Sequence, residues 1–203
     1  MTTATLSRVG RDLALPREAE GFDMPAIARR MWRPLLAMGL MAVAAGVVTG
    51  IVQATLSTPL HVAQVAAWNP GLLFLGVGLL LGSVTFLLAT ILGELRDGGT
   101  SVQKALGEQA LILKRPLTGK LFPPVMMMGL MTLLATLVVG FVEAARLDTN
   151  PSGAADIAAW VGPLRFAGVA LLFTSVSLAL ATIVRSLRFQ AGRIQQIADQ
   201  RSK

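Results

Sequence analysis

The stretch PLLAMGLM at residues 34–41 returns as PVMMMGLM at residues 124–131, with five of eight letters unchanged. Further along, SVTFLLATILGELR at 83–96 returns as SVSLALATIVRSLR at 175–188, and AAW at 66–68 returns at 158–160. The offset is 90 residues for the first match and 92 for the other two. Shared residues in the same order at a nearly constant offset indicate a tandem duplication.

The duplicated unit is strongly apolar. The chain is 54% hydrophobic with a mean hydropathy of +0.65, which is high for a soluble domain. The apolar residues form four runs of about 20 residues, the length that a helix needs to cross a hydrocarbon core of about 30 Å. The runs are 35–54, 71–92, 125–144 and 164–184. The sequence therefore predicts an all-α integral membrane protein with four transmembrane helices.

Each repeat crosses the membrane twice, so both repeats should start on the same side. We expect two parallel helical hairpins related by a two-fold axis along the membrane normal. An N-terminal segment (1–33) with a short amphipathic helix would precede hairpin repeats at 34–115 and 116–203. An apolar stripe of Val102, Leu106, Ala110 and Leu113 predicts an interfacial amphipathic helix over 101–115 after the first hairpin, and a helical tail follows the second.

The basic residues predict the orientation. Sixteen of the 18 lysines and arginines fall in the N-terminal segment, the middle connection or the tail. Such residues favour the cytoplasmic side, so both termini should be cytoplasmic in a multi-pass protein, most simply in a bacterial inner membrane. The net charge of +7 then faces anionic headgroups, and nucleic acid is not needed as a partner.

Small residues inside the runs predict close helix packing. Gly46 and Gly50, and likewise Gly78 and Gly82, have the small-x-x-x-small spacing, and Gly140 repeats it in the third run with Thr136. In membranes this spacing lets two helix backbones approach closely.

Catalysis is not expected from this composition. The chain has one histidine, no cysteine and no tyrosine, whereas enzymes need positioned acids, bases, nucleophiles or metals. The spans instead carry serine and threonine hydroxyls, which favour packing over a polar lining because they can bond back to their own helix.

Charged residues distinguish the second repeat. Glu143 replaces Gln53 and Arg165 replaces Leu73, each near the outer end of its helix, and Asp156 adds acidity just outside. These three residues could form an outer-face site for a ligand or a partner. The alternative is two side chains that extend into the headgroup region.

Methionines suggest the one candidate metal site. Met38 and Met41 match Met128 and Met131, and thioethers are soft ligands suited to Cu(I). Methionine also fills gaps in apolar cores, so no resident cofactor is the simpler expectation.

These features favour a non-catalytic membrane subunit that packs against and stabilises a larger membrane protein complex. Its partners would be larger integral membrane proteins or further copies of the chain. The alternatives are a small oligomeric transporter or channel built from the duplicated hairpin and, third, a copper-handling protein.

Overall fold

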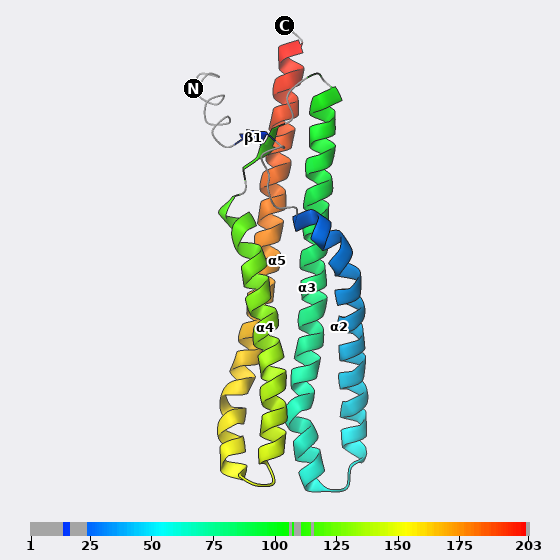
Figure 1. Cartoon of the computed structure of the whole chain (residues 1–203), viewed down its shortest axis with the longest axis vertical. Coiled ribbons are helices and arrows are strands. Elements are labelled where there is room, and N and C mark those ends of the chain that lie inside the picture. Colours follow the sequence, from blue (N-terminus) through cyan, green and yellow to red (C-terminus); the bar gives the residue numbers. More distant parts are fainter. Residues whose placement is uncertain (1–13, 17–23, 106, 108–110, 115, 202–203) are drawn as a thin grey trace.

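Four long helices make up most of the computed structural model, which describes residues 14–16, 24–105, 107, 111–114 and 116–201. They are α2 (Met24–Thr55), α3 (Pro59–Ala105), α4 (Leu117–Arg146) and α5 (Pro151–Arg201), arranged as two hairpins (Figure 1). Each is long and apolar enough to cross a membrane. The predicted set of four apolar helices is confirmed, and it fits a multi-pass membrane protein.

Proline-led turns join the helices of each hairpin. Pro59 begins α3 and Pro151 begins α5, and the first position of a helix tolerates proline because its N–H would have no helical acceptor. Asn150 caps α5, since its side-chain oxygen accepts a hydrogen bond from the Gly153 N–H at 3.1 Å. Both turns lie at the end of the bundle opposite to the start of α2 and the end of α5 (Figure 1).

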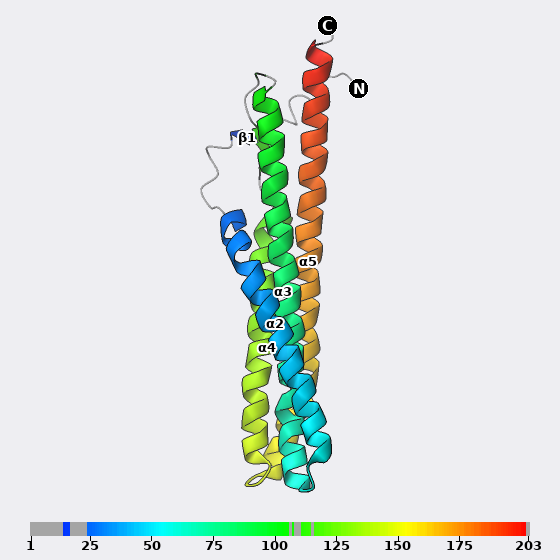
Figure 2. The same cartoon turned by 90° about the vertical axis from the view of Figure 1, so that its right-hand side faces the viewer.

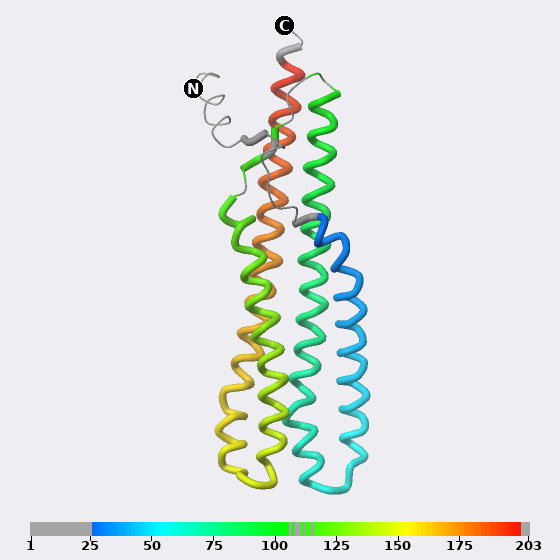
Figure 3. The backbone as a smooth tube through the Cα atoms, viewed as in Figure 1, coloured from blue at the N-terminus to red at the C-terminus, as the bar shows by residue number. Residues whose placement is uncertain are grey.

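The predicted short helix before the first span is part of α2. Helix α2 starts at Met24 and continues through Pro34, and its first turns lean across the bundle (Figure 3). Proline bends a helix because its ring displaces the carbonyl four residues earlier and it lacks an N–H. The bend buries Ala28 completely against Ala89, Phe122 and Ala179 of the other three helices. Residues 1–13 and 17–23 of the expected N-terminal segment lie outside the described residues.

Helix α3 occupies the centre of the bundle. It packs against α2 within the first hairpin and against both α4 and α5 of the second hairpin, and the turned view shows α2 crossing in front of it (Figure 2). Met126, Leu133 and Leu172 form the apolar core between α4 and α5. Among the described residues α2 makes no contact with α5 comparable to that of α4 with α3, so the first helices of the two hairpins have different neighbours.

Helices α3 and α5 extend beyond α2 and α4 at the end where the chain starts (Figure 1). The expected separate helix over 101–115 is wrong there. Residues 101–105 are the last turn of α3, and Leu111–Leu113 form a strand, β2, which pairs antiparallel with β1 (Ala14–Pro16).

Two residues explain why Leu111–Leu113 form a strand and do not continue the helix. Gly107 has a φ of +76°, a left-handed conformation that ends helices. The Gln103 side chain then takes the place of a neighbouring strand. Its Nε2 donates to the Leu111 carbonyl at 3.1 Å, and its Oε1 accepts from the Leu111 N–H at 2.9 Å.

Candidate functional site

Arg165 is the charged side chain that joins the two hairpins near their turn end. It lies on α5, and its Nη2 donates to the Ala67 carbonyl of α3 at 3.0 Å. Ala67 precedes Pro70 by less than one turn, and a proline within a helix disturbs the backbone bonding of the turn before it. The Nε of Arg165 is buried without a hydrogen-bond partner among the described residues. Arg165 thus anchors α5 to a proline-containing section of α3.

The other two residues of the expected outer-face site have different surroundings. Glu143 on α4 is close enough to Arg165 for the two charges to attract each other. Asp156 is exposed and lies nine residues before Arg165 on the same helix, about 13 Å along its axis. Among the described residues, Glu143 and Arg165 therefore lie within electrostatic reach of each other without forming an ion pair, and Asp156 lies apart.

A second polar contact at this end was missed by the sequence analysis. Asn69 on α3 is only 7% exposed, and its Oδ1 accepts a hydrogen bond from the Thr49 hydroxyl of α2 at 2.6 Å. The sequence did contain a signal for this contact, an amide side chain next to Pro70. Both residues lie just before residue 71, where the second apolar run was expected to start. In the second repeat the matching positions are Val139 and Val161, so this polar contact belongs to the first hairpin.

Gly140 marks a close backbone approach of the two hairpins. A Cβ atom at Gly140 would lie 2.9 Å from the Ala67 carbonyl oxygen and 3.0 Å from the Trp68 Cα. These are backbone atoms that a side-chain rotation cannot move. Gly140 therefore allows α4 to lie directly against α3, beside the carbonyl that Arg165 binds.

The other four glycines of the expected packing set have unequal surroundings. A Cβ at Gly46 would lie 2.5 Å from Leu73, and one at Gly78 would overlap the Leu133 side chain. At Gly50 and Gly82 the nearest atoms, Asn69 Nδ2 and Leu130 Cδ1, would lie at 3.4 and 3.5 Å, which is ordinary contact. A side chain at Gly46 or Gly78 would therefore require Leu73 or Leu133 to move, whereas Gly50 and Gly82 leave room for a Cβ atom.

Two further glycine contacts recur inside the hairpins. A Cβ at Gly39 would lie 2.9 Å from Leu80, and a Cβ at Gly129, its match in the second repeat, would lie 2.8 Å from Leu172. Likewise Gly76 faces Val43 at 2.8 Å and Gly168 faces Leu133 at 2.7 Å. In both cases the glycines and their neighbours are offset by 90 or 92 residues, as in the sequence matches.

Hydroxyl groups in the spans bond to backbone carbonyls. Thr85 and Thr136 donate within their own helices at 3.0 and 2.8 Å, whereas Ser175 on α5 donates to the Phe122 carbonyl of α4 at 3.2 Å. Such bonds satisfy the hydroxyl donors in a solvent without water. They give these side chains a structural role.

The four candidate metal-binding methionines point outwards. The side chains of Met38, Met41, Met128 and Met131 are each more than half exposed. They lie on α2 and α4, and each of these helices packs chiefly against α3 or α5. The structure therefore does not gather the four sulfur atoms into one buried site within the chain.

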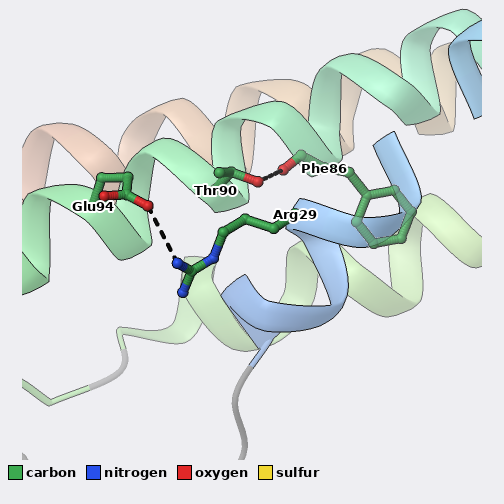
Figure 4. A network of polar contacts seen from close by, with 4 residues as sticks. All are labelled: Arg29, Phe86, Thr90 and Glu94. Atoms are coloured by element: carbon green, nitrogen blue, oxygen red, sulfur yellow. Dashed lines mark hydrogen bonds and ion pairs between the residues drawn. The ribbon is translucent and has the colours of Figure 1, made fainter. Parts of the chain in front are cut away.

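Polar contacts also join the helices at the end where α2 begins. Gln103 of α3 donates to the Gln190 Oε1 of α5 at 2.9 Å in a buried position. Arg29 of α2 reaches Glu94 of α3 at 3.4 Å (Figure 4). The Arg29 and Glu94 side chains are 49% and 63% exposed, so this pair adds little stability.

Comparison with known proteins finds no matching family, no matching curated protein and no matching solved structure. The geometry therefore has to indicate the function by itself. Among the described residues no three histidine, cysteine, aspartate or glutamate side chains form a group that could hold a metal. The polar contacts described above hold helices to one another.

Proposed function

We propose that the chain is a non-catalytic integral membrane subunit that packs against a larger membrane protein complex and stabilises it. The observation that carries the proposal is the position of α2. Only 11% of the residues in its most apolar stretch are buried, against 28–33% in the other three helices. It packs chiefly against α3, so an apolar surface runs the length of the span and is available to another membrane protein.

The duplication supports this reading. The Gly39–Leu80 contact and its match, Gly129–Leu172, hold each hairpin together in the same way. Helix association in membranes depends on such close packing between small residues and their neighbours. A chain made of two similar packing units, with few groups suited to chemistry, is well suited to a structural role.

Charge supports a cytoplasmic location for the end where α2 begins and α5 ends. Arg29, Arg30 and Arg33 lie in the first turns of α2, and Arg185 and Arg188 lie on the extension of α5. Basic residues favour the cytoplasmic side and the anionic headgroups there. We propose a bacterial inner membrane as the location, with both termini in the cytoplasm.

A second candidate is a small oligomeric transporter or channel. Glu143 and Arg165 favour it, because ionisable groups within transmembrane helices commonly mark ion or solute pathways. Against it, Arg165 already binds the Ala67 carbonyl, and the hydroxyls described above donate to backbone carbonyls. Transport assays in liposomes, with Glu143→Gln as the test variant, separate the two functions.

Photo-crosslinking in native membranes tests the proposed function. A photoreactive residue at Val48 or Ile51, on the exposed surface of α2, should attach to another membrane protein and give one product of defined mass. The matched control is Leu134 on the exposed surface of α4, which should attach mainly to lipid. Lipid products alone from both helices would contradict the proposal.

A further inference from the structure

The seam between the hairpins consists of one face of α4 seated on a face of α3 that is rich in small residues. A Cβ at Gly82 would lie 3.5 Å from Leu130, one at Gly71 would lie 3.0 Å from the Leu137 Cα, and Gly140 lies against Ala67 and Trp68. On α4, Leu130, Leu137 and Ala144 are spaced by seven residues, and residues at this spacing lie on one side of a helix. The seam is therefore defined by matched positions on two helices.

The first repeat carries the α4 side of this seam a second time. Leu40, Val47 and Ala54 of α2 match Leu130, Leu137 and Ala144. Leu40 is 55% exposed and Val47 is 51% exposed, and Ala54 is exposed as well. Nothing in the described part of the chain covers this face of α2.

The second repeat carries the α3 side of the seam a second time. The positions on α5 that match Ala67, Gly71 and Gly82 are Ala159, Pro163 and Thr174. All three are exposed. So is Trp160, the match of Trp68. One chain therefore presents both halves of its own internal seam, one on α2 and the other on α5.

We propose that α2 of one copy packs on α5 of a second copy, as α4 packs on α3 within the chain. The proposal rests on the proposed function as a packing subunit and identifies one partner as the chain itself. Such contacts join two different surfaces, so they build rings if the rotation closes and filaments if it does not. Both repeats start on the same side of the bundle, so copies joined in this way would share one orientation in the membrane.

The matched residues fit this joint. The close backbone approach of Gly140 to Ala67 becomes Gly50 against Ala159, which keeps both residue types. Where Gly71 becomes the larger Pro163, the residue opposite changes from Leu137 to the smaller Val47. Shape complementarity between these faces can therefore be kept.

One difference makes the joint between copies weaker than the internal seam. Arg165, which donates to the Ala67 carbonyl, is matched by Leu73 in the first repeat. A leucine cannot donate to the carbonyl of Ala159 in the next copy. Self-association should therefore be weaker than the packing of the two hairpins within one chain.

Disulfide trapping tests the joint, because the natural chain has no cysteine. Leu40→Cys and Thr174→Cys are placed in two separately tagged copies, which are expressed together and oxidised in native membranes. The matching internal pair, Leu130→Cys with Gly82→Cys in one chain, provides the positive benchmark. Met131→Cys with Thr174→Cys is the negative control. Met131 is as exposed as Leu40. It lies on α4, one residue after Leu130, the residue that matches Leu40.

The expected result is a dimer carrying both tags, at least tenfold more abundant than in the control. Ala159→Leu, which introduces a larger side chain at the exposed residue placed opposite Gly50 in the joint, should reduce that yield severalfold. Equal trapping in the control and the test pair, or no mixed dimer while the benchmark forms, would overturn the proposal. An α2 photo-crosslink to a different protein without the mixed dimer would also overturn it and would leave the proposed function standing.

Discussion

The two hairpins share short sequence matches and similar internal contacts, but their first helices have different neighbours. Gly39–Leu80 in one hairpin corresponds to Gly129–Leu172 in the other. Yet α4 packs against both α5 and α3, whereas α2 packs chiefly against α3. The comparison teaches that some of the residues shared by the hairpins lie at the contacts that close each one. Unmatched residues, such as Arg165 opposite the Ala67 carbonyl, determine how one hairpin meets the next.

The largest effect should come from breaking the seam at Gly140. Gly140→Val places its Cβ against the Ala67 carbonyl oxygen and the Trp68 Cα. Overpacking of this kind should lower the unfolding free energy by about 3 kcal/mol. The matched Gly50→Val meets its nearest atom at 3.4 Å and should change stability by no more than about 0.5 kcal/mol. Unfolding in mixed micelles, followed by tryptophan fluorescence, measures the stability of both variants. Equal losses of stability in Gly140→Val and Gly50→Val would contradict the difference expected between the two glycines.

A smaller loss of stability is expected when Arg165, near the outer end of the second hairpin, is changed to leucine, the residue at the matching position of the first. Arg165→Leu removes the bond to the Ala67 carbonyl and leaves Glu143 without its neighbouring positive charge. The expected loss is about 2 kcal/mol. The double change Glu143→Gln with Arg165→Leu reproduces the first-repeat residues and should restore part of that loss. A double variant less stable than Arg165→Leu alone would show that the two side chains do not act together.

Conversion of residues in the first hairpin to their counterparts in the second should cause a smaller loss of stability. Asn69→Val leaves the Thr49 hydroxyl without its acceptor on α3, and hydrogen bonds between membrane helices average about 0.6 kcal/mol. Thr49→Val with Asn69→Val installs the residue type of the second repeat, valine, at both positions. Removal of both partners is often nearly neutral, so the double variant should unfold close to the natural chain. If the two single losses simply add, the hydrogen bond contributes nothing measurable.

The smallest effect concerns the ion pair at the start of α2. Arg29→Gln and Glu94→Gln should each lower stability by less than about 1 kcal/mol, because both side chains are largely exposed. The pair should show coupling in a double-variant cycle at low salt. That coupling should vanish at about 1 M salt, where charges are screened within about 3 Å. Coupling that persists at high salt would indicate a less exposed contact.

The sequence predicted the four apolar helices because runs of about 20 apolar residues have few alternatives in a membrane. It underestimated their extents. Helix α3 spans Pro59–Ala105, beyond the expected 71–92, since polar residues on either side continue a helix until something ends it. Gly107 does so, and the hydrogen bonds from Gln103 favour β2, so Leu111–Leu113 form a strand where the interfacial helix was expected.

The candidate site was less accessible to sequence reasoning. Comparison of the repeats singled out Glu143 and Arg165, but the bond from Arg165 to Ala67 depends on α3 and α5 being neighbours. Asn69 was passed over because hydropathy assigned it to a connection, although it is buried within α3. The unequal neighbours of α2 and α4 could not be read from two nearly matching apolar patterns.

The most direct test of the central claim is the mass of the intact particle purified in mild detergent from the native membrane. The account predicts a particle of fixed composition, larger than the 21.4 kDa chain, in which this chain is bound to other membrane proteins or to further copies of itself. A monodisperse particle with the mass of one chain, obtained under conditions that preserve other membrane complexes of the same sample, would contradict it.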